Sequence, residues 1–152
     1  MPVYNSNSPE ATFQIGHRFG SQLRPPAIVL LTGELGAGKT VFTKGIVTAL
    51  GASGDEVVRS PSFSLVNVYD TPAGQVLHVD LYRLSSSRDL QSIGFEEILA
   101  SEAIVIVEWA EKLAFPIPEA HTVRIEIDAS SGRRRLIIDS PKTGGDQVPG
   151  NS

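Results

Sequence analysis

The chain of 152 residues contains no cysteine and only one methionine and one tryptophan. The absence of cysteine excludes disulfide bonds and thiolate metal sites, which fits a reducing compartment. No apolar run approaches the roughly 18 residues that a membrane-spanning helix needs. The first residues, MPVYNSNSPEA, lack the basic start and the apolar stretch of a secretory signal. We therefore expect a cytoplasmic protein that does not associate with membranes.

Basic residues are also in the minority. Thirteen Lys and Arg stand against 17 Asp and Glu, which gives a formal net charge of -4. Because an acidic chain is a poor match for a phosphate backbone, strong direct binding of nucleic acid is disfavoured. The length is that of one domain with one core. We expect residues 1–139 to form this domain, and residues 140–152, which are poor in apolar side chains, to form a flexible tail.

Hydrophobic patterning predicts an alternation of helices and strands. Apolar residues at helical spacing predict three helices, over residues 11–23, 39–50 and 89–99, and SPE at residues 8–10 resembles the start of the first. Continuous or alternating apolar runs predict two buried strands, over 27–32 and 103–107, and two hairpins, over 62–82 and 122–139. The pattern favours an α/β fold with a mixed sheet, in which parallel core strands and antiparallel hairpins are flanked by helices.

One stretch, GELGAGKT, matches the pattern GxxxxGK[ST] between a predicted strand and a predicted helix. Glycines let the backbone turn several N–H groups toward one point, where a polyphosphate can bind beside the positive end of the helix dipole. Lys39 would reach the β and γ phosphates, and the Thr40 hydroxyl would bind Mg²⁺. The alternative, a glycine turn before an ordinary helix, is disfavoured by this context. We therefore predict a single P-loop NTPase domain whose nucleotide contacts are Gly33, Glu34, Leu35, Gly36, Ala37, Gly38, Lys39 and Thr40.

Two acidic residues end apolar strands and are candidates to complete the site. Glu108 follows the buried run 103–107, where a carboxylate is costly unless it faces an ion or solvent. It would hold Mg²⁺, and the alternative is a solvated acid at the end of a strand. Asp80 ends QVLHVD and would share the metal shell or orient the attacking water, unless it is a hairpin-edge acid paired with Arg83.

Other segments carry weaker signals. Trp109 follows Glu108 and either anchors the core or brings its ring near the nucleotide, whereas His78 is interpreted as an ordinary strand residue. SPSF, residues 60–63, lies where switch segments contact the γ-phosphate, although the local sequence slightly favours a proline turn. DTPAGQ, residues 70–75, has its glycine one residue too late for the GTPase motif DxxG, and no [NT]KxD motif occurs. ATP is therefore preferred over GTP.

Taken together, GELGAGKT, SPSFSLV, HVDLYRL, GFEEIL and VEWAEKL resemble the TsaE family of bacterial ATPases, formerly YjeE, over residues 8–138. The resemblance implies an ATPase that works with TsaB and TsaD to make N6-threonylcarbamoyladenosine at position 37 of tRNAs reading codons that begin with A. Such an ATPase would contact tRNA only indirectly, through the complex. It would be slow alone, and its hydrolysis of ATP would reset the complex.

The resemblance also implies the roles of individual residues. Glu34 to Thr40 would hold the phosphates, Thr40 and Glu108 would bind Mg²⁺, and Asp80 would be needed for activity. Thr12 and Arg133 match positions near the nucleotide. The catalytic residues predicted in this way are Lys39, Asp80 and Glu108, with ATP and Mg²⁺ as cofactors.

Two other functions are compatible with a P-loop. In a small-molecule kinase, GRRR at residues 132–135 would act as a lid that clamps phosphate, although the run lies in a predicted hairpin. A regulatory module would hold ATP without hydrolysing it. Analysis of phosphorylated products would separate the kinase from the ATPase, whose phosphate acceptor is water.

Overall fold

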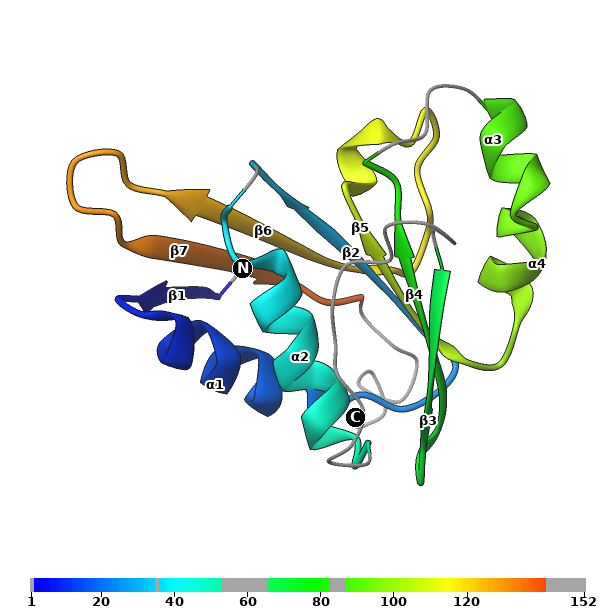
Figure 1. Ribbon diagram of the computed structural model, residues 1–152, viewed down its shortest axis with the longest axis horizontal. Coiled ribbons are helices and arrows are strands. Elements are labelled where there is room, and N and C mark those ends of the chain that lie inside the picture. Colours follow the sequence, from blue (N-terminus) through cyan, green and yellow to red (C-terminus); the bar gives the residue numbers. More distant parts are fainter. Residues whose placement is uncertain (1, 35, 53–65, 83–86, 142–152) are drawn as a thin grey trace, which may run out of the picture.

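The computed structural model describes residues 2–34, 36–52, 66–82 and 87–141. These residues form a seven-stranded mixed sheet in the order β1-β7-β6-β2-β5-β4-β3 (Figure 1). The strands are β1 Val3–Ser6, β2 Ala27–Gly33, β3 Val66–Thr71, β4 Gly74–Asp80, β5 Ile104–Glu108, β6 His121–Ile127 and β7 Arg134–Asp139. The helices are α1 Pro9–Gly20, α2 Lys39–Ala49, α3 Ser87–Ser92 and α4 Phe95–Ala100, with a 3₁₀ helix η1 at Ala110–Lys112.

The centre of the sheet is parallel and its flanks are antiparallel. β5 pairs in parallel with β2 and with β4, and β2 also pairs in parallel with β6. The hairpins β3–β4 and β6–β7 and the pair β1–β7 are antiparallel. Parallel strands place their carboxyl ends at one edge of the sheet, which is where open α/β sheets bind ligands. Gly33, Asp80 and Glu108, the last residues of β2, β4 and β5, therefore share this edge.

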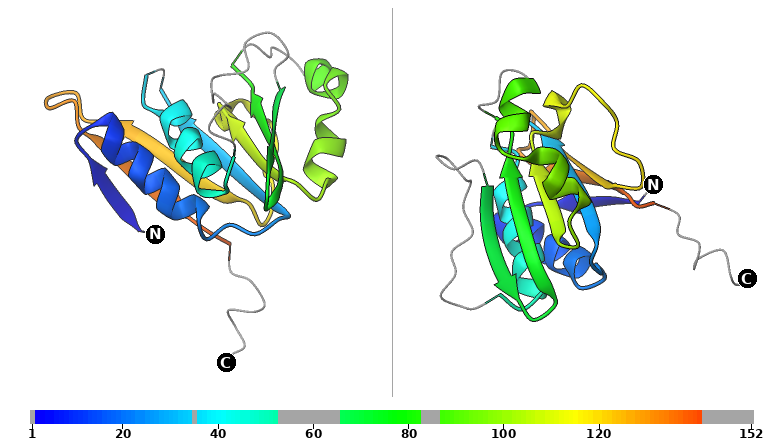
Figure 2. Two further views of the ribbon diagram at one scale, coloured as in Figure 1. Left: turned by 60° about the horizontal axis from the view of Figure 1, so that its bottom comes forward. Right: turned by 90° about the vertical axis from the view of Figure 1, so that its right-hand side faces the viewer.

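Each face of the sheet carries its own apolar core. α1 and α2 lie side by side over one face, where Phe42 of α2 joins a core that includes Ile104 and Ile106 of β5 (Figure 1). α3, α4 and η1 cover the other face beside β4 and β5, where a second core includes Val105 and Val107 (Figure 2). Successive residues of β5 thus alternate between the two cores, as the pleat of a strand requires. A helix layer on both faces explains why β5 is buried at every position.

α1 and α2 approach closely because glycines line their contact. A Cβ atom added at Gly20 would lie 2.7 Å from the Cα atom of Ile46, and one added at Gly45 would lie 2.8 Å from the backbone nitrogen of His17. The same close approach brings the start of α1 to the loop before α2, because a Cβ atom at Gly38 would lie 3.6 Å from Cγ2 of Thr12. α1 therefore forms one wall beside the glycine loop.

The structure confirms the predicted α/β fold and its mixed sheet, and it corrects three elements. The first helix starts in the predicted SPE segment, where the Ser8 hydroxyl accepts a hydrogen bond from the Ala11 N–H at 3.1 Å, but it ends at Gly20 rather than at residue 23. The helix predicted over 89–99 is two helices, since Gly94 adopts a φ of 70° at the N-cap of α4. Strand β1 was not predicted because half of its four residues are polar, and pairing with β7 holds it in place.

Some predictions fall outside the described residues. They concern Leu35 in the glycine loop, SPSF at 60–63, Arg83 and residues 142–152 of the predicted tail. Within the described ranges, no helix combines the length and the apolar character needed to cross a bilayer.

Candidate nucleotide-binding site

The loop between β2 and α2 has the backbone geometry of an anion-binding turn. Gly36 and Gly38 have φ values of 82° and 110°, a region that residues with a Cβ atom rarely adopt. The Ala37 N–H donates to the Glu34 carbonyl at 3.1 Å and tightens the turn. α2 begins at Lys39, and Gly38 gives its first turn no side-chain cap. Because the first N–H groups of a helix lack intrahelical partners, this turn is suited to bind phosphate oxygens.

Lys39 projects from the start of α2 into the centre of the site. Its side chain is nearly buried, with 5% of the residue exposed. The Nζ atom donates to the carbonyl of Gly33 at 2.5 Å and to that of Glu34 at 3.1 Å. It also lies 4.0 Å from the centroid of the Trp109 ring, which is a cation–π distance. The ammonium group is therefore held over the loop that precedes it.

Carboxylates surround this ammonium group. Burial lowers the pKa of Lys39, because the charged form loses hydration, and the negative charges of Glu111, Glu108, Asp80 and Glu34 oppose that shift. The same carboxylates would repel the phosphates of a nucleotide. A divalent cation bound together with the nucleotide would reduce this repulsion.

Glu108 and Asp80 lie on the face of the sheet that α2 covers. Glu108 is 2% exposed, and its Oε2 atom accepts a hydrogen bond from the Thr40 hydroxyl at 3.3 Å. The alternative of a solvated acid at this position is therefore wrong. Asp80 is 8% exposed, faces Glu108 in the β4–β5 register and accepts a hydrogen bond from the Tyr82 N–H at 2.9 Å. The structure thus brings Lys39, Thr40, Asp80 and Glu108 together.

The oxygen atoms of Thr40 and Glu108 suit Mg²⁺, a hard cation that prefers hydroxyl, carboxylate and phosphate oxygens. Among the described residues, no group of three or more His, Cys, Asp or Glu could hold a metal ion by itself. The donor set of Thr40 and Glu108 is therefore compatible with Mg²⁺.

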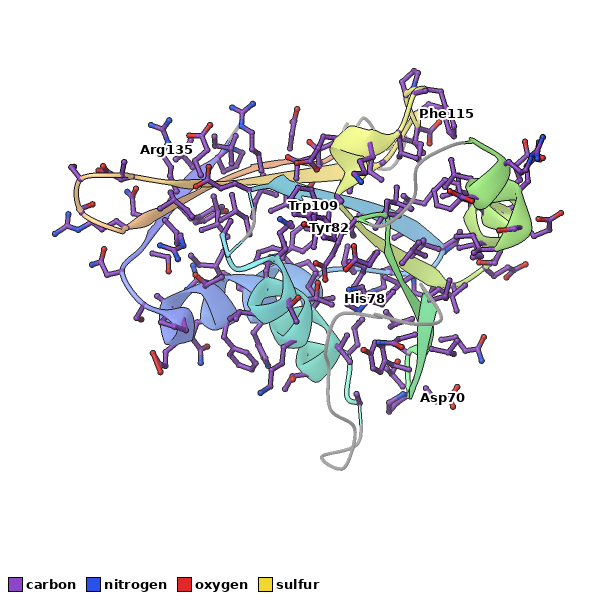
Figure 3. The ribbon with its side chains drawn as sticks, turned by 45° about the horizontal axis from the view of Figure 1, so that its top comes forward. Asp70, His78, Tyr82, Trp109, Phe115 and Arg135 are labelled. Carbon is purple, nitrogen blue, oxygen red and sulfur yellow. The ribbon has the colours of Figure 1, made fainter. Side chains whose placement is uncertain are left out.

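Trp109 packs at the mouth of the site. Its backbone has a φ of 60° and a ψ of 40° at the N-cap of η1, a strained conformation for an aromatic residue. The Tyr82 ring lies 4.9 Å away between centroids, and Figure 3 shows the two rings next to one another beyond the ends of β4 and β5. The Nζ atom of Lys112 donates to the Tyr82 carbonyl and stands 5.4 Å from the Tyr82 ring. The ring of Trp109 is thus fixed between Tyr82 and Lys39.

A pocket of about 200 Å³ opens on the other side of the loop. It is lined by the start of α1, the loop and the β6–β7 hairpin, including Thr12, Gly36, Val41 and Arg134. The Thr12 hydroxyl is 2.7 Å from the hydroxyl of Ser6 in β1. Thr12, the residue predicted from the N-terminal segment, therefore lies beside the glycine loop, in a hollow that the loop also lines.

The arginine that contacts the loop carbonyls is Arg134, whereas the family resemblance pointed to Arg133, whose place near the nucleotide stays a prediction. The Arg134 guanidinium donates to the carbonyls of Ala37 and Gly36, both at 3.1 Å, and to that of Gly132. Arg133 lies exposed in the hairpin turn and lines a second hollow together with Asn5 and Arg134. The two arginines are adjacent in the sequence. Their side chains point differently because β7 begins at Arg134 and side chains alternate along a strand.

Two more residues of the site escaped the sequence interpretation. A carboxylate oxygen of Glu111 accepts a hydrogen bond from the Gly33 N–H at 3.3 Å. Glu111 belongs to the motif VEWAEKL, which was the signal available in the sequence. His78, interpreted as an ordinary strand residue, is fully buried with its Nε2 atom 2.5 Å from Oε2 of Glu108. Its position two residues before Asp80 on one strand was the available signal, because such residues face the same side of a sheet.

The comparisons with known proteins agree with this geometry. The family model described as threonylcarbamoyl adenosine biosynthesis protein TsaE matches residues 6–137. Proteins named tRNA threonylcarbamoyladenosine biosynthesis protein TsaE include one from Mycobacterium leprae, which is 40% identical over 128 residues and covers 77% of both chains. The one from Treponema pallidum is 36% identical over 134 residues, covering 88% of this chain and 96% of its own.

A solved structure extends the likeness to three dimensions. The crystal structure of YdiB from Bacillus subtilis superimposes with a TM-score of 0.76 at 25% identity. The match covers 93% of this chain and 86% of YdiB. The family model, the curated relatives and the fold agree with the family indicated by the sequence motifs. The chain therefore belongs to the TsaE family.

Proposed function

We propose that this chain is a Mg²⁺-dependent ATPase required for the N6-threonylcarbamoyladenosine modification of tRNAs that read codons beginning with A. The observation that carries the proposal is the meeting of the glycine loop, the Lys39 ammonium and the Thr40–Glu108 pair at one edge of the sheet. Family membership supplies the pathway, because the relatives are named for threonylcarbamoyladenosine biosynthesis.

The residues divide the work by their chemistry. The backbone of the loop and Lys39 would bind the phosphates and neutralise their charge. Thr40 and Glu108 would hold Mg²⁺, and bound Mg²⁺ would stabilise the charge that develops on the transferred phosphoryl group. Asp80, in register with Glu108, would position the attacking water or support the metal shell. Thr12 and Trp109 would contact the nucleotide from either side of the loop.

The partners follow from the same family. We propose that the chain acts with TsaB and TsaD in the cytoplasm, contacts tRNA through that complex and hydrolyses ATP to reset it. Its formal charge of -4 supports leaving the tRNA contacts to partners. An ATPase that must be gated by partners would turn over slowly alone.

The small-molecule kinase has less support. A lid built from residues 132–135 would have to move over the nucleotide, whereas Arg134 and Arg135 belong to strand β7. Arg134 is bonded to the loop carbonyls and Arg135 to the Glu126 carboxylate at 2.7 Å. These bonds anchor the run in place.

Phosphate release from ATP tests the proposal, measured with and without TsaB and TsaD. We expect slow release by the chain alone, stimulation by the two partners, and a loss of at least about 100-fold for Lys39→Ala, the size of effect that follows removal of a charge-stabilising group. Unchanged turnover in purified Lys39→Ala would contradict the assigned site. If TsaB and TsaD neither bind nor stimulate the chain, the role in tRNA modification fails. A phosphorylated small molecule among the products would favour the kinase.

A further inference from the structure

A histidine lies behind the Glu108 carboxylate, inside the protein. His78 belongs to β4, is fully buried and places Nε2 2.5 Å from Oε2 of Glu108. The same Oε2 atom accepts the Thr40 hydroxyl from the other side at 3.3 Å. Figure 3 shows His78 between the β4 strand and α2, below the Trp109 and Tyr82 rings. Polar groups from two different elements therefore converge on one carboxylate oxygen.

The sheet register places the histidine there. His78 faces Ile106 across the parallel β4–β5 pair, so Glu108 lies one pleat further along β5 and on the same face. The positions before them on this face, Val76 and Ile104, are apolar core residues. His78 therefore follows directly on apolar core positions, where a buried polar group is costly unless it forms a hydrogen bond.

The surroundings also fix which ring nitrogen carries the hydrogen. Among the described residues, Nδ1 of His78 is the one buried side-chain nitrogen or oxygen atom without a hydrogen-bond partner. A buried donor left unpaired is rarer and more costly than an under-satisfied acceptor. The neutral tautomer with its hydrogen on Nε2 uses that hydrogen for Glu108 and leaves Nδ1 as an acceptor. His78 thus donates its Nε2 hydrogen to the Glu108 carboxylate.

We propose that His78 is a positioning residue that orients the Glu108 carboxylate for the Mg²⁺–nucleotide complex. The bond from Nε2 fixes Oε2 together with Thr40, so that Oε1 is presented to the metal shell. This inference rests on the proposed function of the site, and it adds a group that touches neither metal nor nucleotide. Partners of metal ligands in such outer positions typically contribute 10- to 100-fold to metal affinity.

A matched pair of variants tests the role. The side-chain nitrogen of Gln in His78→Gln is separated from Cβ by as many bonds as Nε2 of histidine, whereas that of Asn in His78→Asn corresponds to Nδ1. Both variants place a side-chain amide at position 78, and only the longer Gln side chain can donate to Glu108. Trp109 is the single tryptophan and lies 4.0 Å from Nζ of Lys39, so we expect its fluorescence to change when ADP binds.

The measurement is a Mg²⁺ titration at fixed ADP concentration, followed by Trp109 fluorescence. We expect His78→Asn to raise the half-saturating Mg²⁺ concentration about 10- to 100-fold, with ADP affinity in the absence of Mg²⁺ unchanged, and His78→Gln to stay close to the wild type. A folded His78→Asn variant with the Mg²⁺ dependence of the wild type overturns the inference alone. A wild-type chain whose ADP binding ignores Mg²⁺ contradicts the proposed function instead.

A second measurement needs no change at position 78. The chain has three histidines, His17, His78 and His121, so the ¹⁵N resonances of the rings can be assigned with His17→Gln and His121→Gln. We expect His78 to show a protonated Nε2 and an unprotonated Nδ1, and Glu108→Gln to shift the resonances of this ring more than those of the other two. A hydrogen on Nδ1, or a His78 ring that does not respond to Glu108→Gln, overturns the inference.

Discussion

Gly45 lies in the contact between α1 and α2, and Gly45→Ala tests how closely the two helices pack. Alanine has the higher helix propensity, which by itself would stabilise α2 by about 1 kcal/mol. The added Cβ atom, however, would overlap the Phe13 carbonyl oxygen and lie 2.8 Å from the His17 nitrogen, where ordinary contacts begin at 3.4 Å. Since these atoms belong to the backbone, no rotamer change relieves the overlap. To bring the Cβ–nitrogen distance from 2.8 Å to an ordinary 3.4 Å, the helices must separate by at least about 0.6 Å.

Overpacking of this kind costs typically about 1–3 kcal/mol, and at the upper end it exceeds the propensity gain by about 2 kcal/mol. For a chain of this length we expect the melting temperature to fall by about 4–8 °C. Thermal unfolding measures this, with Thr48→Ala as control, because Thr48 is exposed on the same helix and its replacement should raise stability slightly. A melting temperature of Gly45→Ala above that of the wild type would refute the close helix contact.

Two further predictions concern charged groups of the site. Arg134→Met removes the donors to the Gly36 and Ala37 carbonyls. If the loop is thereby destabilised by about 1.4 kcal/mol, ADP binding weakens about tenfold, which Trp109 fluorescence measures. An equal effect of Arg133→Met would contradict the assignment of Arg134 as the arginine that holds the loop. Burial lowers the pKa of Lys39 below 10.5, so the unfolded chain binds that proton more tightly, and the free energy of unfolding should rise with pH between the lowered pKa and 10.5. Urea unfolding of the wild type and of Lys39→Met should show this rise only in the wild type, and a pH-independent difference between them would show that Lys39 is not desolvated.

Local chemistry made much of this protein predictable from its sequence. The glycine loop, Lys39 and Thr40 are contiguous, so their spacing alone specifies a turn that leads into a helix and gathers N–H groups. Glu108 could be predicted as a site residue because the five apolar residues before it indicate a buried strand. A carboxylate at the end of such a strand is costly unless it faces an ion or solvent. The motifs were sufficient to indicate the family that the comparisons then showed.

The tertiary structure alone decided which side chains meet at the loop. His78 and Glu108 are neighbours because β4 and β5 pair in one particular parallel register, and a shift of one residue would turn one of them to the opposite face. Arg134 rather than Arg133 contacts the glycine loop because β7 begins at Arg134. Thr12 lies beside the same loop because α1 and α2 pack closely at their glycines. Spacing along the chain specifies a turn or a helix, whereas contacts between distant segments depend on register and packing, which no single segment encodes.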